Sequence, residues 1–105
     1  MQSETFLNPW QSSNLEKFIQ ELQKEMCESH LLFGANLEIV ARRRDRDEYL
    51  FKYIDEEKYA QVHLTWRGAI EPDPFWPVTT IYDTIEQWKT EIMIPNNLRY
   101  GSETE

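Results

Sequence analysis

Three consecutive segments between residues 35 and 66 alternate apolar and polar side chains, and this alternation constrains the fold more than any other feature. A period of two is typical of strands with one buried face. If residues 45–47 form the first connection and residues 55–58 the second, one register gathers the most apolar side chains on one side. These are Leu37, Ile39, Ala41, Tyr49, Phe51, Tyr53, Ala60, Val62, Leu64 and Trp66. The pattern predicts a three-stranded antiparallel meander.

The opposite side of this meander mixes polar and apolar side chains, whereas a solvent-facing side is usually more uniformly polar. In the same register, Leu50 lies across from both Arg42 and His63. A half-apolar open face favours docking of another molecule. We expect an interaction surface made of Val40, Arg42, Leu50, Ile54, Tyr59, His63 and, from the loop that follows, Trp76.

Two segments outside the meander have helical spacing. Ser13 and Glu16 form a capping box before an apolar stripe, which predicts a helix over about residues 14–29. A second capping signature at residues 83–86 predicts a helix over about residues 84–93, ended by Pro95. Between them, residues 78–81 have the composition of a short fourth strand.

These elements predict an α+β fold in a single domain over residues 1–105. The order is an N-terminal helix, the three-stranded antiparallel meander and a C-terminal helix, and we expect both helices on one sheet face. Residues 1–12 are expected to form a loosely docked arm, although Phe6, Leu7 and Trp10 are able to anchor it. We expect residues 101–105 to form a frayed tail.

The chain is acidic, with 19 Asp and Glu residues against 11 Lys and Arg residues and a net charge of −8. This charge repels phosphate backbones and favours encounter with a basic protein. The basic cluster of Arg42, Arg43, Arg44 and Arg46 lies among carboxylates. We therefore expect a salt-bridged hairpin tip, with a phosphate contact in a nucleic-acid accessory protein as the alternative. No signal peptide or membrane-length apolar run is visible, so we expect a soluble cytoplasmic protein.

Motifs for metal binding or catalysis are missing. His30 and His63 are far apart in the sequence, and neither has metal-ligand spacing; Cys27 is the single cysteine. Glycines are isolated, which disfavours a phosphate-binding loop. We therefore expect no metal and no cofactor. His30 is expected to cap the first helix, and His63 with Thr65 to serve structure or recognition, because catalysis would also need an orienting acid and an oxyanion hole.

Residues 71–77, which we call the proline loop, contain Pro72, Pro74 and Pro77. Prolines restrict the unfolded chain, so this loop is expected to be preorganised. Phe75 and Trp76 either close the edge of the core or offer an aromatic anchor to a partner.

The segment from Val62 to Met93 contains the tetrapeptide at residues 63–66 (His-Leu-Thr-Trp), followed by Glu71-Pro72, Trp76-Pro77 and Trp88. With this pattern, roughly the C-terminal half of the chain resembles a group of small bacterial proteins of about this length. No activity is assigned to that group, so the resemblance transfers no catalytic or binding residue. It implies a bacterial cytosolic origin and a shared architecture.

Taken together, the sequence favours a non-enzymatic protein-interaction module, either immunity- or antitoxin-like or self-associating as a homodimer. The alternative is a small enzyme or ligand-binding protein. Its pocket would lie between the sheet and the proline loop, lined by His63, Thr65 and Glu71.

Overall fold

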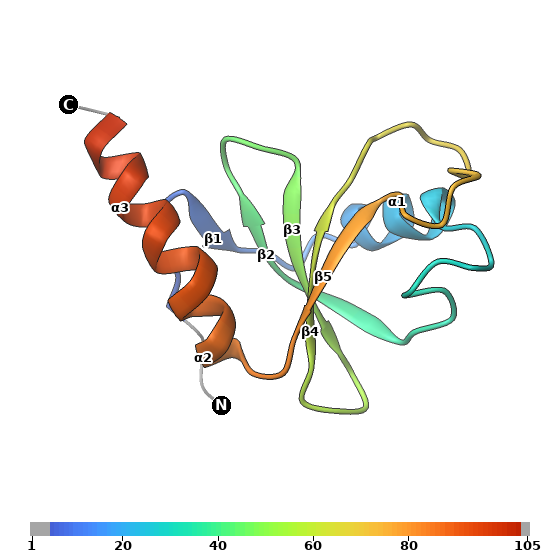
Figure 1. The fold of residues 1–105 in the computed structure, drawn as a ribbon, viewed down its shortest axis with the longest axis horizontal. Coiled ribbons are helices and arrows are strands. Elements are labelled where there is room, and N and C mark those ends of the chain that lie inside the picture. Colours follow the sequence, from blue (N-terminus) through green and yellow to red (C-terminus); the bar gives the residue numbers. More distant parts are fainter. Residues whose placement is uncertain (1–4, 104–105) are drawn as a thin grey trace.

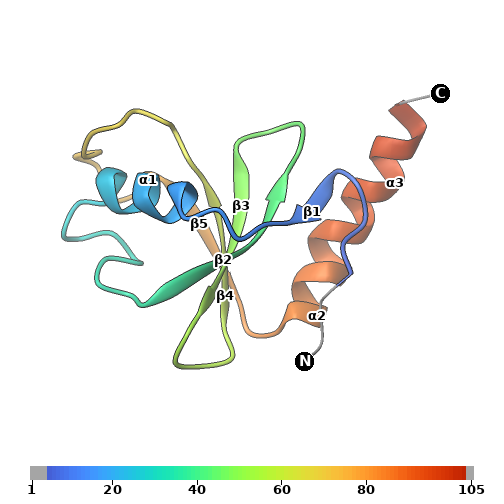
Figure 2. The same cartoon turned by 180° about the vertical axis from the view of Figure 1, so that it is seen from behind.

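The computed structural model describes residues 5–103 (Figures 1 and 2). Within this range, five strands form one antiparallel sheet in chain order. They are β1 (Trp10–Ser12), β2 (Leu37–Arg43), β3 (Glu48–Tyr53), β4 (Tyr59–His63) and β5 (Val78–Tyr82). The helical segments are α1 (Lys17–Glu25), α2 (Ile85–Trp88), the π-helical η1 (Lys89–Met93) and α3 (Ile94–Glu103). The predicted α+β class and antiparallel sheet are confirmed, and strands β1 and β5 extend the meander at its two edges.

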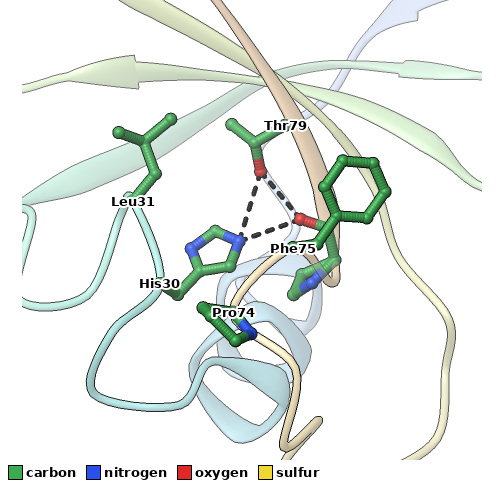
Figure 3. Close-up of a pocket in the computed structure, with 6 residues that line it drawn as sticks. His30, Leu31, Pro74, Phe75 and Thr79 are labelled. Atoms are coloured by element: carbon green, nitrogen blue, oxygen red, sulfur yellow. Dashed lines mark hydrogen bonds between the residues drawn. The ribbon is translucent and has the colours of Figure 1, made fainter.

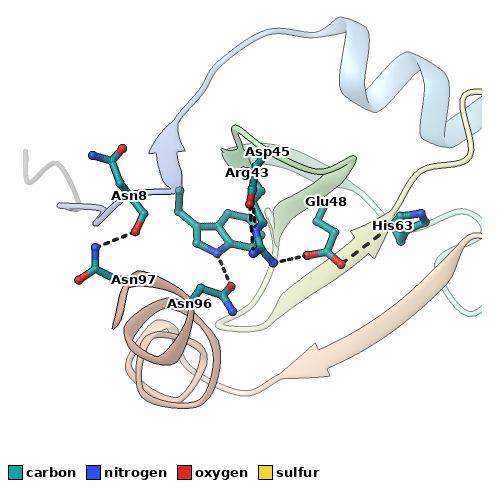
Figure 4. Close-up of polar contacts among 8 residues, drawn as sticks. Asn8, Arg43, Asp45, Glu48, His63, Asn96 and Asn97 are labelled. Atoms are coloured by element: carbon teal, nitrogen blue, oxygen red, sulfur yellow. Dashed lines mark hydrogen bonds and ion pairs between the residues drawn. The ribbon is translucent and has the colours of Figure 1, made fainter. Parts of the chain in front are cut away.

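The N-terminal segment is docked rather than loose over its described part. Strand β1 places Trp10 opposite Arg43, and the Trp10 side chain is buried. Its indole Nε1 donates to Asn96 Oδ1 at 2.9 Å, and Asn97 Nδ2 donates to the carbonyl of Asn8 at 2.7 Å (Figure 4). The expected loose arm is therefore wrong for residues 5–12, because burying an indole stabilises this docking. Residues 1–4 lie outside the described range.

The helices cover opposite faces of the sheet, so the expectation of one shared face is wrong. In both views, α1 lies on one side of the sheet and the α2–α3 segment lies on the other (Figures 1 and 2). The first core joins α1 to one face and contains Phe18, Leu22, Met26, Leu32, Leu37, Ile39, Tyr49, Phe51, Ala60, Val62 and Leu64. The second core joins the C-terminal helix to the other face and contains Trp10, Ala41, Leu50, Tyr59, Tyr82, Ile85, Trp88 and Met93. The mixed composition of the second face therefore reflects a second core.

The second hairpin is paired two residues away from the expected register, and so is the first hairpin up to residue 39. Ile39 lies opposite Phe51 instead of Tyr53, and His63 lies opposite Glu48 instead of Leu50. A shift of two residues keeps each side chain on its expected face, because strand side chains alternate with a period of two. Most side chains of the meander therefore lie on the predicted face although the predicted register is wrong.

A β-bulge between Ile39 and Ala41 makes the exception. It inserts one residue into β2 and reverses the alternation beyond it. Ala41 therefore joins the second core instead of the first. Arg42 is turned toward the α1 side, where its guanidinium lies 5.5 Å from the centre of the Phe18 ring.

The first helix is shorter than predicted. It begins at Lys17, and the Ser13 hydroxyl accepts the amide of Leu15 at 3.3 Å rather than that of Glu16. The predicted capping box is thus not formed, and α1 ends at Glu25 instead of near residue 29.

The C-terminal helix is longer than predicted. Thr84 is its N-cap and accepts the amide of Gln87 at 3.0 Å, as the capping signature indicated. The helix continues through Pro95 to Glu103 by way of the π-turn, in which the amide of Ile94 donates to the carbonyl of Lys89. A wider turn leaves room for the proline ring, which would otherwise meet the carbonyl four residues earlier. Residues 101–103 are therefore helical instead of frayed, while residues 104–105 lie outside the described range. None of the helices in residues 5–103 has the length and apolar character needed to cross a membrane.

Candidate functional site

A pocket of about 150 Å³ lies beside the proline loop (Figure 3). The turn after α1 contributes His30 and Leu31, and β5 contributes Thr79. The proline loop supplies the remaining lining residues, Pro74, Phe75 and Pro77. Two parts of the chain that are distant in the sequence, residues 30–31 and residues 74–79, thus build one concave site.

His30 forms the ordered polar floor of this pocket. Its ring is buried, and its Nδ1 accepts the amide of Leu32 at 3.0 Å. The proton of the neutral ring must then be on Nε2, which donates to the carbonyl of Pro77 at 2.8 Å. The Thr79 hydroxyl donates to the same carbonyl at 3.0 Å (Figure 3). His30 therefore ties the turn to the proline loop, and its expected role as a helix cap is wrong, since α1 ends five residues earlier.

The mouth of the pocket is apolar and exposed. Leu31 and Phe75 are 63% and 64% exposed, although both are large apolar side chains. Trp76 is also partly exposed and makes an edge-on contact with Phe75, with ring centres 5.6 Å apart. Exposed aromatic and aliphatic groups around a concavity are typical of surfaces that bind other molecules.

Cationic side chains are missing from the segments that build the pocket. Residues 25–41 and 68–88 contain no lysine and no arginine. The same segments carry Glu25, Glu28, Glu38, Glu71, Asp73, Asp83 and Glu86. Glu28 and Asp73 are exposed and lie within two residues of the lining residues His30 and Pro74. The two segments that build the pocket therefore carry negative charge.

Two buried acids on α1 anchor the chain that leads into the proline loop. Glu25 accepts the amide of Thr65 at 3.0 Å on Oε1 and the amide of Trp66 at 2.7 Å on Oε2. Glu21 Oε2 accepts the amide of Gly68 at 2.9 Å. The carbonyl of Glu25 also accepts the amide of Glu71 at 2.9 Å, where the loop begins. These contacts fix the entry to the proline loop against α1.

The two acids are hydrogen-bonded to each other and have opposite pKa shifts. Burial raises the pKa of Glu25, and its hydrogen bond with Glu21 raises it further. The hydrogen bond from Glu25 lowers the pKa of Glu21. The pair therefore favours a proton on Glu25 over one on Glu21, whose carboxylate accepts the amide of Gly68.

The residues expected to form one open interaction surface lie in different places in the structure, and several of them are buried. Leu50 and Tyr59 are buried in the second core under the C-terminal helix, so they cannot meet a partner. Val40 packs against the same core and is partly buried. Arg42 lies over Phe18 on the other face. The expected open face is therefore wrong, because the C-terminal helix covers it.

Ile54 and His63 are exposed but do not line the pocket. Glu48 Oε2 lies 3.9 Å from Nδ1 of His63 and Glu48 Oε1 lies 3.1 Å from Arg43, which also pairs with Asp45 at 2.8 Å (Figure 4). The predicted salt-bridged hairpin tip is thus present at Arg43. Trp76 does not line the pocket either, but its ring contacts Phe75, which does.

The predicted pocket lining of His63, Thr65 and Glu71 is also wrong. The Thr65 hydroxyl donates to Glu71 Oε2 at 2.9 Å, and Arg67 donates to Glu71 Oε1 at 2.9 Å. The side chains of Thr65, Arg67 and Glu71 are thus hydrogen-bonded to one another at the start of the proline loop. His63 is not part of this group. A pocket does lie beside this loop, but other residues line it.

Sequence reasoning missed Leu31 as a site residue. The available signal was an apolar run, His30-Leu31-Leu32-Phe33, placed just before Gly34. A turn cannot bury every member of such a run, and only His30 and Leu32 are buried here. An apolar run in a turn, like Phe75-Trp76 in the proline loop, is therefore a sign of an exposed apolar surface.

Within residues 5–103, no group of three His, Cys, Asp or Glu side chains is placed to hold a metal ion. Comparison with protein-family models, curated proteins and solved structures found no match. A functional proposal for this protein therefore rests on the geometry of the pocket and of the segments that build it.

Proposed function

We propose that this protein is a non-enzymatic protein-interaction module that binds a basic partner through the pocket beside the proline loop. The observation that carries the proposal is the exposed apolar pair of Leu31 and Phe75 at the pocket, with Trp76 against Phe75, on chain segments that contain acids and no lysine or arginine. An apolar anchor with complementary charge around it provides both affinity and fast association. An immunity- or antitoxin-like role fits this chemistry, and the resemblance to small bacterial proteins supports a bacterial cytoplasmic setting.

The size of the pocket favours a protein partner over a metabolite. Pockets for small molecules and cofactors usually measure about 300–1,000 Å³. The present volume of about 150 Å³ is closer to that of a cavity that accommodates one benzene ring. The pocket therefore fits a single aromatic or aliphatic side chain of a larger molecule.

A small ligand-binding protein or enzyme is the second candidate, because a pocket does lie beside the proline loop. The state of His30 opposes catalysis, since Nδ1 accepts from Leu32 and Nε2 donates to Pro77. The ring has no nitrogen left for a substrate unless these contacts break. A homodimer is the other variant, and the net charge of −8 opposes it because two copies repel each other.

The test is affinity capture from host-cell extract by three proteins: wild type, Phe75→Ala and Phe33→Ala. Phe33 is the matched control, because it is 51% exposed in the same region and does not line the pocket. We expect a basic protein to be retained by wild type and Phe33→Ala, and to bind Phe75→Ala at least about tenfold more weakly. Both variants should unfold at the wild-type temperature, since neither removes a buried side chain.

Equal capture of the same protein by all three forms would contradict the proposal. So would light scattering that shows a stable dimer dissociated by Phe75→Ala and not by Phe33→Ala, because the occupant of the pocket would then be a second copy.

A further inference from the structure

Strand β5 forms one edge of the sheet. It pairs with β4 along Val78–Tyr82, and within residues 5–103 no strand pairs with its other side. In an antiparallel pair, alternate residues direct their N–H and C=O groups away from the neighbour. Among the described residues, no backbone hydrogen bond joins this outer side of β5 to another segment. The outer edge is thus a row of backbone donors and acceptors without a backbone partner in the described chain.

This edge lacks the usual protection against strand addition. Natural sheets guard their edges with lysine, proline or bulges. The five residues of β5 contain neither lysine nor proline, and their register with β4 is unbroken. The other edge strand, β1, has three residues and is braced by the contact between Trp10 and Asn96. Strand β5 is therefore the edge that is better suited to receive another strand.

The pocket lies at the beginning of β5. Pro77 immediately precedes the strand, Thr79 lies within it, and both line the pocket. A chain that pairs with the outer side of β5 would pass the mouth formed by Leu31 and Phe75. Strand addition to a sheet edge commonly combines these two elements, because main-chain hydrogen bonds provide affinity and a side-chain pocket provides specificity.

We propose that β5 receives an extended segment of a basic partner as a sixth strand, with one aromatic or aliphatic side chain in the pocket. This inference rests on the proposed function and specifies how the partner is held. Pairing along the five residues of β5 requires a segment of about five residues, roughly 17 Å long. Lysine or arginine residues next to the inserted side chain would then face Glu28 and Asp73, which are exposed near the pocket.

A library of random twelve-residue peptides displayed on phage provides the probe, since the partner is unidentified. Selection on the wild-type protein should enrich peptides that place an aromatic or aliphatic residue next to lysine or arginine. Their affinity should fall at least about tenfold on Phe75→Ala and remain unchanged on Phe33→Ala. Failure to enrich any peptide that depends on Phe75, or enrichment of acidic peptides, would overturn the proposed function itself.

The mode of binding is tested separately with two methylated versions of the best peptide. One carries N-methyl groups on its odd-numbered residues and the other on its even-numbered residues. Only one set of amides faces β5 in a paired strand, so one version should lose about tenfold or more in affinity and the other little. Amide exchange followed by NMR should also show that alternate amides of residues 78–82 become protected when the unmethylated peptide binds.

Binding that depends on Phe75 but responds equally to both methylated versions, with unchanged exchange along β5, would overturn strand addition and leave the proposed function intact. Protection of the outer β5 amides in a dimer of the free protein would likewise overturn it, because a second copy would then occupy the edge.

Discussion

Glu25 holds the backbone of Trp66, 41 residues away in the chain, through a hydrogen bond of 2.7 Å from the Trp66 amide to Oε2. Trp66 has a φ angle of 57°, in the left-handed region that a bulky residue rarely adopts. The carboxyl group of Glu25 therefore stabilises a backbone conformation that the sequence alone would not favour. This contact also sets where the chain starts toward the proline loop.

Replacement of Glu25 by alanine should destabilise the protein by about 2–4 kcal/mol, because it leaves the amides of Thr65 and Trp66 without their acceptor. Denaturant unfolding measures this loss. Replacement of Glu28, which is exposed on the turn that follows the same helix, should change the free energy of unfolding by about 0.5 kcal/mol or less. Equal effects at the two positions would contradict the anchoring role of Glu25.

The acid pair predicts a specific dependence of stability on pH. The pKa of Glu25 is raised above its ordinary value of 4.5, so above pH 4.5 the unfolded chain releases this proton before the folded protein does. The Glu25 contribution to stability is therefore full below 4.5 and is lost as pH rises through the folded pKa. The pKa of Glu21 is lowered, so its contribution is present above 4.5 and is lost as pH falls through its folded pKa.

Glu25→Gln isolates the first of these effects, since glutamine resembles the protonated acid and does not titrate. We expect wild type to lose stability relative to Glu25→Gln as the pH rises above 4.5 in denaturant unfolding. A difference between the two proteins that stays constant over this range would show that Glu25 does not hold the raised pKa.

Trp88 should be much more costly to remove than Trp76. It is fully buried in the second core, and its Nε1 donates to Gln61 Oε1 at 2.7 Å. Trp88→Ala should destabilise the protein by about 3–5 kcal/mol. Trp76→Ala, at a partly exposed position, should cost about 1 kcal/mol or less. Thermal unfolding of the two variants checks this order, and a reversed order would contradict the second core as described.

The ring of His30 should show the Nε2–H tautomer when neutral. The hydrogen bonds with Leu32 and Pro77 leave no alternative in the folded protein. Two-dimensional ¹⁵N–¹H spectra of the imidazole distinguish the tautomers directly. His63 serves as the internal comparison, because its ring is exposed and should populate both neutral tautomers. An Nδ1–H tautomer at His30 would contradict the described floor of the pocket.

The face of most strand residues was predictable because it depends on alternation alone. Tyr49, Phe51, Val62 and Leu64 lie in the first core as the pattern indicated, even though neither hairpin has the expected register. The bulge at Val40 was not predictable, since no glycine or proline marks it. Because of this bulge, Ala41 and Arg42 each lie on the face opposite to the one predicted for them.

The C-terminal helix covers the sheet face that was expected to be an open interaction surface. The half-apolar composition of the second face predicts an exposed interaction surface, but it is equally typical of a second core. Leu50 and Tyr59 became buried because that helix packs on them, and the sequence pattern contains no signal for the side on which a helix packs. The pocket depends on contacts between distant segments, as between His30 and Pro77, which local patterns do not reveal.

The most direct test of the account compares the affinity of one selected basic peptide for wild type, Phe75→Ala and Phe33→Ala by titration calorimetry. We predict that Phe75→Ala binds at least about tenfold more weakly and that Phe33→Ala binds as wild type does. Equal affinity for all three proteins would contradict the claim that the pocket beside the proline loop is where this protein meets its partner.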